Sequence, residues 1–406
     1  MRKFLILCMV LASISISCGK DEIRNVNKET KDSTNTVGNE KNTGKKDSAL
    51  VIEQTPEIDT SGNNYYNNIS SRFIAGEDIK FSSVFDDHIK TAVYKNYKNA
   101  MSNSWNTVYK NRLSSMKEWY ADKIEPDVED SLNLSYPFSG PDVLHSFTFY
   151  PYAHNYFFIA LENTGSLPPI EKMKISNVSA YLYDLNQSIK DVMSISYFLT
   201  KKMMVALKRD KVDGALPVLC LFIAKTGNTV LSYESLYMNG EGKFSNDKDS
   251  NFLTPCLKIV FKNNNSNYIQ NIYYFKQDLS DGKNLNNSGV LEFVKSGGKF
   301  NTYVKAASYL MHHGNFSSVR NLILENSNTV LEDDTGIPYK YFDSKIWDKK
   351  FYGEYVAPIT LFQIRNQPDL KAAFKNNKKG DLPFNMGYHI GNAKLQNILF
   401  FSRIRD

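Results

Sequence analysis

Residues 257–275, which read LKIVFKNNNSNYIQNIYYF, carry the clearest secondary-structure pattern in the sequence. Two runs rich in Ile, Val, Tyr and Phe, 257–262 and 268–275, flank a segment of four asparagines and one serine. β-Branched and aromatic residues favour strands, whereas Asn favours tight turns. The stretch therefore predicts two antiparallel strands joined by a turn over 263–267.

Similar runs occur on both sides of this hairpin, with helical patterns between them. Further strands are expected at 146–150, 156–161, 217–224, 229–238, 328–331, 384–390 and 396–403. Helices are expected over 184–208, 301–312, 316–326 and 368–374. Because no regular strand–helix–strand order emerges, the predicted fold class is α+β, with helical insertions among mixed, mainly antiparallel strands.

A helical pattern also opens the folded part of the chain, over 83–124. Apolar residues recur there at steps of three and four residues, first at Phe85, Ile89, Val93 and Tyr97 and again from Trp105 onward. This spacing predicts one or two amphipathic helices whose aromatic stripe lies in the core.

The N-terminus has the pattern of an export signal. Arg2 and Lys3 precede 14 residues, 4–17, that are all apolar or small. A helix of that length is too short to cross a hydrocarbon core of about 30 Å, so 1–17 is predicted to be a signal peptide. The run ends in Ser-Ile-Ser-Cys-Gly (15–19), which resembles a bacterial lipobox, although Ser15 stands where Leu is usual.

That resemblance implies a bacterial lipoprotein. In such proteins the signal peptide is cut before the cysteine, here Cys18, and acyl chains such as palmitate are attached to it. Two or more chains hold a protein firmly on a membrane. The alternative is an ordinary secretory signal in which Cys18 has no role.

The next residues bear on location. Lys20-Asp21-Glu22 resembles the surface-export signal of lipoproteins in one group of Gram-negative bacteria. The alternative is the first turn of a charged linker. The expected location is thus the cell envelope, on the outer membrane, with the periplasmic and surface faces both open.

Residues 18–64 are predicted to be the lipidated cysteine and a disordered tether. From 19 to 64 there is no aromatic residue, and seven basic and nine acidic residues lie among Asn, Thr, Ser and Gly. Such a segment buries too little apolar surface to offset its ordering entropy, and it spans roughly 35–40 Å as a flexible coil. The remaining 65–406 is expected to form one body, or two packed halves of about 65–240 and 241–406.

Composition excludes several classes of protein. The 406 residues are 42% hydrophobic and carry a net charge of +6. This apolar content is too high for a disordered chain, and the apolar residues do not form the long runs of a polytopic membrane protein. The small positive excess is spread over a long chain and argues against a nucleic-acid partner. Cys220 and Cys256, the two cysteines of the body, are expected to be buried thiols, or alternatively a disulfide.

Chemical motifs are sparse, and no cofactor or metal is expected. His145 follows Asp142 by three residues, and Asp333-Asp334 comes directly after a predicted strand. Carboxylates and imidazole at such positions suit acid–base chemistry, so these four residues form a candidate catalytic site. Aspartates in such segments also serve as turn formers, which is the alternative.

Three segments resemble a family of uncharacterised bacterial exported proteins: YPFSGPD at 136–142, DDTGIPY at 333–339 and LPFNMGYH at 382–389. The resemblance would cover roughly 80–403. It implies a single folded unit and no particular activity.

The leading functional hypothesis is a lipid-anchored envelope protein that binds a protein or glycan partner through surface aromatic residues. One alternative is an envelope hydrolase that uses Asp142, His145 and the Asp333–Asp334 pair. The other is a structural lipoprotein without a ligand site.

Overall fold

A computed structural model describes residues 63–79, 84–129, 132–195 and 212–404. These residues belong to one compact unit. The predicted signal peptide, Cys18, most of the tether and the end of the predicted helix 184–208 lie outside the described residues. Among those that are described, no helix is both long and apolar enough to span a bilayer.

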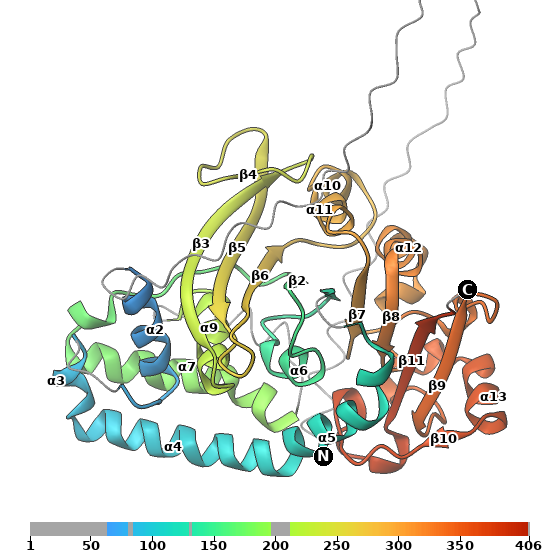
Figure 1. Cartoon of the computed structure of the whole chain (residues 1–406), viewed down its shortest axis with the longest axis horizontal. Coiled ribbons are helices and arrows are strands. Elements are labelled where there is room, and N and C mark those ends of the chain that lie inside the picture. Colours follow the sequence, from blue (N-terminus) through green and yellow to red (C-terminus); the bar gives the residue numbers. More distant parts are fainter. Residues whose placement is uncertain (1–62, 80–83, 130–131, 196–211, 405–406) are drawn as a thin grey trace, which may run out of the picture. The chain divides into compact units, whose positions relative to one another are not determined.

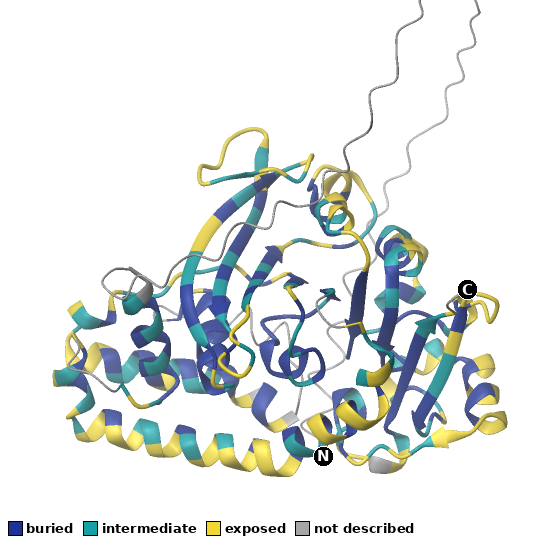
Figure 2. Cartoon of the chain, in the orientation of Figure 1, coloured by how far each residue is buried: buried dark blue, intermediate teal, exposed yellow. Residues whose placement is uncertain are grey.

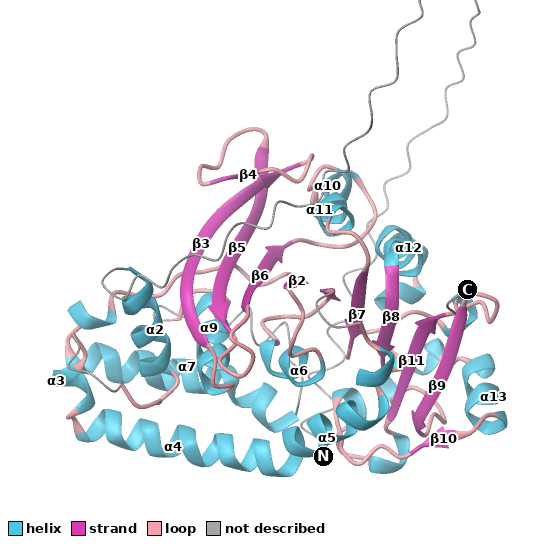
Figure 3. Ribbon diagram, viewed as in Figure 1, coloured by secondary structure: helices cyan, strands magenta, loops and turns pink. Residues whose placement is uncertain are grey.

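The described residues form one sheet of eleven strands in the order β10-β9-β11-β8-β7-β1-β2-β6-β5-β3-β4 (Figures 1 and 3). The strands are β1 (Asn133–Pro137), β2 (Asn155–Ala160), β3 (Thr229–Asn239), β4 (Phe244–Ser245), β5 (Phe252–Lys262), β6 (Ile269–Lys276), β7 (Phe300–Val304), β8 (Ser327–Glu332), β9 (Trp347–Gly353), β10 (Lys379–Gly380) and β11 (Asn397–Arg403). The protein is therefore a mixed α/β structure built on one large mixed sheet.

The centre of this sheet is parallel, contrary to the predicted predominance of antiparallel strands. Neighbouring strands in the series β8-β7-β1-β2-β6 are all parallel, whereas β5, β3 and β4 continue the sheet on one side with antiparallel pairs. On the other side β11 is antiparallel to β8 and β9. Central parallel strands are buried on both faces, so they lack the alternating pattern that marks a strand in a sequence.

Helices cover both faces of the sheet. They are α2 (Asn63–Ile74), α3 (Asp86–Ile89), α4 (Ala92–Val108), α5 (Ser114–Lys123), α6 (Val143–Phe149), α7 (Ile175–Ile195), α9 (Leu216–Lys225), α10 (Lys283–Asn286), α11 (Val290–Ser296), α12 (Ser317–Asn326) and α13 (Pro368–Asn376). One hydrophobic core joins α2, α4–α7 and α9 to one face, and a second core joins α10–α13 to the other.

Strand alternation divides the side chains between these two cores. On β2, Tyr156 and Phe158 enter the first core while Phe157 and Ile159 enter the second. Figure 2 shows the result, with buried strands at the centre and exposed residues along the outer side of α4.

The hairpin predicted over 257–275 is confirmed. β5 and β6 pair antiparallel with Lys258 opposite Tyr273. In the connecting turn the Asn263 side chain accepts a hydrogen bond from the backbone N–H of Asn265 at 3.0 Å, and Asn267 has a left-handed φ of 60°. Asn tolerates this conformation better than most residues, which is why the Asn-rich segment forms the turn.

Two expected strands are helices. Residues 217–224 lie in α9, and 146–150 lie largely in α6. A fully apolar run has no period to distinguish a buried helix from a strand, and Pro217 fits the first turn of a helix. For α6 the deciding residue is Asp142, whose side chain caps the helix by accepting from the His145 N–H at 3.2 Å.

Two further expectations fail in the second half of the chain. The helix predicted at 301–312 is strand β7 followed by turns, and 384–390 contains a short 3₁₀ turn, Gly387–His389, in place of a strand. Four of the five residues of β7, namely Phe, Thr, Tyr and Val, favour strands, and burial in the middle of the sheet decides the conformation of the segment.

Cys220 and Cys256 are free, buried thiols, and the disulfide left open by the sequence does not form. Cys220 lies on α9 in the first core, whereas Cys256 on β5 points into the second core. On β5, Leu257 points into the first core, so its neighbour Cys256 points to the opposite face of the sheet. The sheet therefore lies between Cys256 and Cys220.

Candidate functional site

The parallel strands define one special position in the sheet. The chain passes from β1 to β2 and β6 on one side, and then returns to the opposite side of β1 to form β7 and β8. The direction of winding thus reverses between β1 and β7. In open α/β sheets, ligands bind outside the carboxyl ends of the strands at such a point.

Four titratable residues follow these strand ends. Asp142 and His145 come after β1, Lys305 comes directly after β7, and Asp333 comes directly after β8. Lys305 Nζ donates to Asp142 Oδ2 at 2.6 Å, and the N–H of the next residue, Ala306, donates to Asp333 Oδ2 at 2.9 Å. The segment Lys305-Ala306 therefore contacts both Asp142, which is paired with His145, and Asp333, which precedes Asp334. We call Asp142, His145, Lys305 and Asp333 the strand-end cluster.

Asp142 is the centre of the cluster and is 1% exposed. Besides Lys305, it accepts hydrogen bonds from Tyr136 OH at 3.0 Å and, with Oδ1, from His145 Nδ1 at 2.8 Å. Burial by itself would raise the pKa of Asp142, but His145 and Lys305 outweigh it and hold that pKa far below its ordinary value. Asp142 is therefore an anion at neutral pH.

His145 is neutral at the same pH. Its ring is fully buried, and burial lowers its pKa to about 4. Nδ1 faces Asp142 and lies 3.0 Å from Lys305 Nζ. Among the described residues no hydrogen-bond partner reaches His145 Nε2. A carboxylate on one ring nitrogen, with the other nitrogen unpaired, is an arrangement shared with general bases, although Nε2 is buried in this structure.

Asp333 differs from Asp142 in the direction of its pKa shift. Burial, followed by the charge of Asp334, raises the pKa of Asp333 to about 6. Its carboxylate also accepts from the N–H of Thr335 at 3.0 Å and from the Thr335 hydroxyl. A carboxyl group that titrates near neutral pH can donate and accept a proton under physiological conditions.

Asp334 points elsewhere. It accepts hydrogen bonds from Tyr309 OH and from Asn397 Nδ2, the latter at 3.0 Å, and His389 Nε2 lies 3.5 Å from its Oδ1. Of the adjacent pair, then, Asp333 joins the Lys305 segment and Asp334 ties β8 to neighbouring segments.

The third segment of the sequence resemblance, 382–389, reaches the same place. A Cβ atom at Gly387, whose φ is 64°, would lie 2.8 Å from Asp333 Oδ2. Tyr388 OH donates to Ala306 O at 2.9 Å and lies 2.7 Å from Ser308 Oγ. The segments 136–142, 333–339 and 382–389 therefore converge on the strand-end cluster.

Lys305 is the residue of this cluster that sequence reasoning missed. The segment around it was expected to be a helix, in which a lysine is ordinarily solvated. Only its place at the end of β7 buries it to 3% exposure beside Asp142. No local pattern in the sequence marks it.

Unusual backbone geometry accompanies the cluster. In the described part of the chain, five residues other than glycine have a left-handed φ, and four of them follow β1 or β7: Phe138, Ala306, Ser308 and Tyr309. Such conformations cost about 1–3 kcal/mol each and concentrate at functional sites.

Unpaired polar atoms are found on the connection from β1 to α6 and in the first turn of α6. Ser139 Oγ is buried and, like His145 Nε2, has no hydrogen-bond partner among the described residues. An unsatisfied buried polar group costs roughly 1–3 kcal/mol, and such groups are normally satisfied by water or a ligand. This connection is therefore suited to hold a polar ligand.

Arg112 adds a second buried cation near the cluster. It lies in a π-helical turn, Tyr109–Leu113, between α4 and α5, and its guanidinium donates to Val192 O at 3.0 Å. Burial lowers the pKa of Arg112 to about 10, while the charge of Asp142 acts in the opposite direction. π-Helical turns are frequent at functional sites.

Half-buried aromatic residues lie on the segments that form the cluster or that contact it. Phe362 packs on Tyr309 and on Tyr388, with ring centroids 5.0 and 5.6 Å apart, and Phe138 packs on Phe316 at 5.9 Å. Phe138, Phe362 and Tyr388 are half-buried. We call these three residues the aromatic rim.

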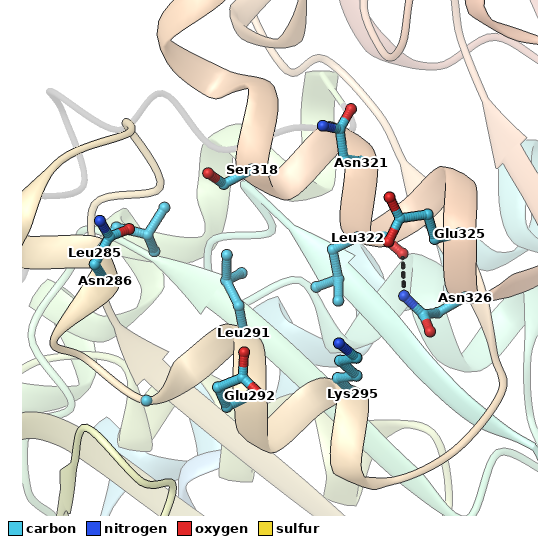
Figure 4. Close-up of a pocket in the computed structure, with 11 residues that line it drawn as sticks. Leu285, Asn286, Leu291, Glu292, Lys295, Ser318, Asn321, Leu322, Glu325 and Asn326 are labelled. Carbon is cyan, nitrogen blue, oxygen red and sulfur yellow. Dashed lines mark hydrogen bonds between the residues drawn. The ribbon is translucent and has the colours of Figure 1, made fainter. Parts of the chain in front are cut away.

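A separate groove of about 380 Å³ lies between α11 and α12 (Figure 4). Leu291 and Leu322 line it together with Glu292, Lys295 and Glu325, whose side chains are exposed. It contains no aromatic residue and no residue of the strand-end cluster. Because the strand-end cluster combines buried titratable groups with the point where the winding of the sheet reverses, which the groove lacks, the cluster is the stronger candidate.

Among the described residues, no group of three or more His, Cys, Asp or Glu side chains is placed to hold a metal ion. No family model, curated protein or solved structure matches this chain.

Proposed function

We propose that this chain is a bacterial lipoprotein, anchored to the envelope through acylated Cys18, whose body (65–406) binds an envelope glycan at the strand-end cluster. The lipobox-like segment 15–19 supports the anchor, and the aromatic-free stretch 19–64 supports a tether. The binding site is carried by one observation, the convergence of 136–142, 333–339 and 382–389 on the carboxyl ends of parallel strands.

The composition of the site favours a glycan. A sugar offers apolar C–H faces together with many hydroxyl groups. The aromatic rim supplies faces on which a ring can stack, and Ser308, Tyr388 and Ser139 supply hydroxyl partners close by. The buried ion pair of Asp142 and Lys305 fixes the geometry of the strand ends below them.

Hydrolysis of the bound glycan is the second candidate function. Asp333, with its pKa of about 6, has the proton affinity of a general acid, and His145 has an unpaired, buried Nε2 on a ring that Asp142 orients. Two groups whose environments separate their protonation states are the basis of acid–base assignments in glycosidases and related enzymes.

The anchor is tested by metabolic labelling with an alkyne analogue of palmitate. We expect the wild-type chain to be labelled and to fractionate with membranes, and Cys18→Ala to lose both properties. Cys8→Ala is the matched control, because Cys8 lies within the predicted signal peptide and should leave with it. Membrane-bound, labelled Cys18→Ala would contradict the anchor.

Proteolysis of whole cells decides which face carries the body. Degradation by externally added protease would agree with the export signal suggested by Lys20-Asp21-Glu22. Full protection would place the protein on the periplasmic side.

The binding site is tested by calorimetric titration of the unacylated Cys18→Ala chain with N-acetylglucosamine oligomers. We expect Tyr388→Ala to weaken binding about tenfold, because a stacking face is lost. Tyr183→Ala, at an exposed position of α7, is the control and should bind normally. Absence of binding by the parent chain would contradict the glycan proposal. Release of reducing ends that disappears in Asp333→Asn would establish hydrolysis.

A further inference from the structure

A loop between β9 and α13 exposes an unusual amount of apolar surface. Residues 356–366 read VAPITLFQIRN and contain one charged residue. Ile364 is 86% exposed, Val356 41% and Leu361 36%. Isolated apolar residues on a surface are common, but several in one short loop mark an interaction site.

Both ends of this loop are fixed. Gln367 N–H donates to Tyr355 OH at 3.1 Å, and Gln367 Nε2 donates to Asp334 O at 3.1 Å. Within 356–366 the backbone hydrogen bonds are local, from Phe362 N–H to Ile359 O and from Asn366 N–H to Gln363 O. The segment is thus a compact Ω-loop whose ends are joined and which exposes Val356, Leu361 and Ile364.

Positive charge surrounds the loop. Arg365 contacts His313, and Arg320 donates to His313 O at 3.3 Å. Burial and, after it, the charge of Arg365 lower the pKa of His312 to about 4; Lys340 acts in the same direction and Asp334 in the opposite one. No carboxylate of the described residues forms a salt bridge with Arg320, Lys340 or Arg365. Lys340 and Arg365 therefore carry positive charge beside the loop without a carboxylate in salt-bridge contact, whereas Arg320 is buried and donates to backbone carbonyls.

We infer that the Ω-loop 356–366 inserts Leu361 and Ile364 into the surface of an anionic phospholipid membrane, with Arg365 and Lys340 against the headgroups. An apolar tip flanked by cations is the composition of an interfacial membrane contact. The inference rests on the proposed anchor, which keeps the body near a membrane. Because the anchor raises the effective concentration of the loop at the membrane surface, a weak contact is sufficient.

The inner side of the loop connects this contact to the strand-end cluster. Phe362 packs on Tyr309 and Tyr388, which hydrogen-bond to Asp334 and to Ala306 O respectively. The membrane surface and the glycan site would therefore share one loop, with the membrane on its outer side.

The test is co-sedimentation of the unacylated Cys18→Ala chain with two kinds of vesicle. One contains phosphatidylethanolamine and phosphatidylglycerol, and the other only phosphatidylcholine. We expect stronger binding to the anionic vesicles. Ile364→Asp should reduce that binding about tenfold or more, and Arg365→Gln should reduce the preference for anionic vesicles.

Leu253→Asp is the matched control, because Leu253 is 55% exposed on β5 and receives the same change. It should bind like the parent chain, and thermal unfolding should show that all variants fold. Equal loss in Leu253→Asp and Ile364→Asp, or no binding to either vesicle, would overturn the inference. Because these chains carry no acyl group, the result does not depend on whether Cys18 labelling succeeds.

Discussion

At the strand ends, the cost of burying charged side chains is opposed by the attraction between them. Burying the ions of Asp142 and Lys305 costs several kcal/mol each, and their attraction offsets this only because His145 and Tyr136 complete the hydrogen bonds. Removing one partner of such a pair leaves an uncompensated buried charge. A fold that needed only stability would be served as well by apolar side chains here. Stability alone therefore does not require this cluster.

Asp333 makes stability depend on pH. Its pKa is about 6 in the folded protein and near 3.9 in an unfolded chain, so the folded state binds the proton more tightly. The folded protein thus gains stability as pH falls through about 6 to about 4 and loses it as pH rises. Asp333→Asn cannot titrate. The free energy of unfolding of wild type minus that of the variant should fall by up to about 3 kcal/mol between about pH 4 and pH 7.

Urea denaturation of both proteins at the two pH values measures this difference. A difference that stays constant with pH, or that rises, would show that Asp333 does not carry the raised pKa.

At the scale of elements, tight backbone contacts hold connections in place. The loop after β2 meets the start of α9, where Ser166 N–H donates to Asp213 O at 3.1 Å and Ala215 N–H donates to Asn163 O at 2.8 Å. Gly165 has a φ of 76°, and a Cβ atom there would lie 1.9 Å from Asp213 O. Glycine is required at this position both for its conformation and for the close approach.

Gly165→Ala should therefore lower the free energy of unfolding by at least about 3 kcal/mol, which exceeds the cost of a left-handed alanine alone. Gly227→Ala is the control. Gly227 has a φ of 84° but nothing within 4 Å of its added Cβ, so we expect a loss of about 1–2 kcal/mol. Chemical denaturation compares the two, and equal losses would contradict the role assigned to the contact.

At the scale of the whole molecule, one sheet contains strands from both halves of the predicted body. β3 begins before residue 240 and pairs with β5 after it, and β1 pairs with β7. Helices α2 and α13, near opposite ends of the chain, pack on opposite faces. Such an arrangement favours one cooperative unit over two independent halves.

The proposed tether predicts how proteases divide the chain. Seven basic residues lie between 19 and 64, the last being Lys46, and the next basic residue is Arg72 in α2. Limited digestion with trypsin should therefore cleave at or before Lys46 ahead of any site in the described part of the body. Mass spectrometry of the fragments measures this order. Early cleavage within the described residues, with 20–46 intact, would contradict the division.

How far the sequence predicts the fold depends on the range of the interactions involved. The β5–β6 hairpin, α12 and β11 follow local patterns and were found where expected. The strand–helix errors at α9 and β7 occur where a segment is buried on all sides and its periodicity is lost. The pairing of two antiparallel strands that follow each other in the chain can be predicted from the sequence, whereas the pairing of parallel strands from distant segments cannot.

The sequence by itself determined the hairpin at 257–275. It also singled out Asp142, His145, Asp333 and the segment 382–389. The lipid anchor at Cys18 remains a prediction from the sequence. Only the tertiary structure decided that these segments meet, and that Lys305 stands between them. The physical reason is that turn and strand preferences act over a few residues. The order of parallel strands is set by which distant segments bury each other's faces, and that order places their carboxyl ends side by side.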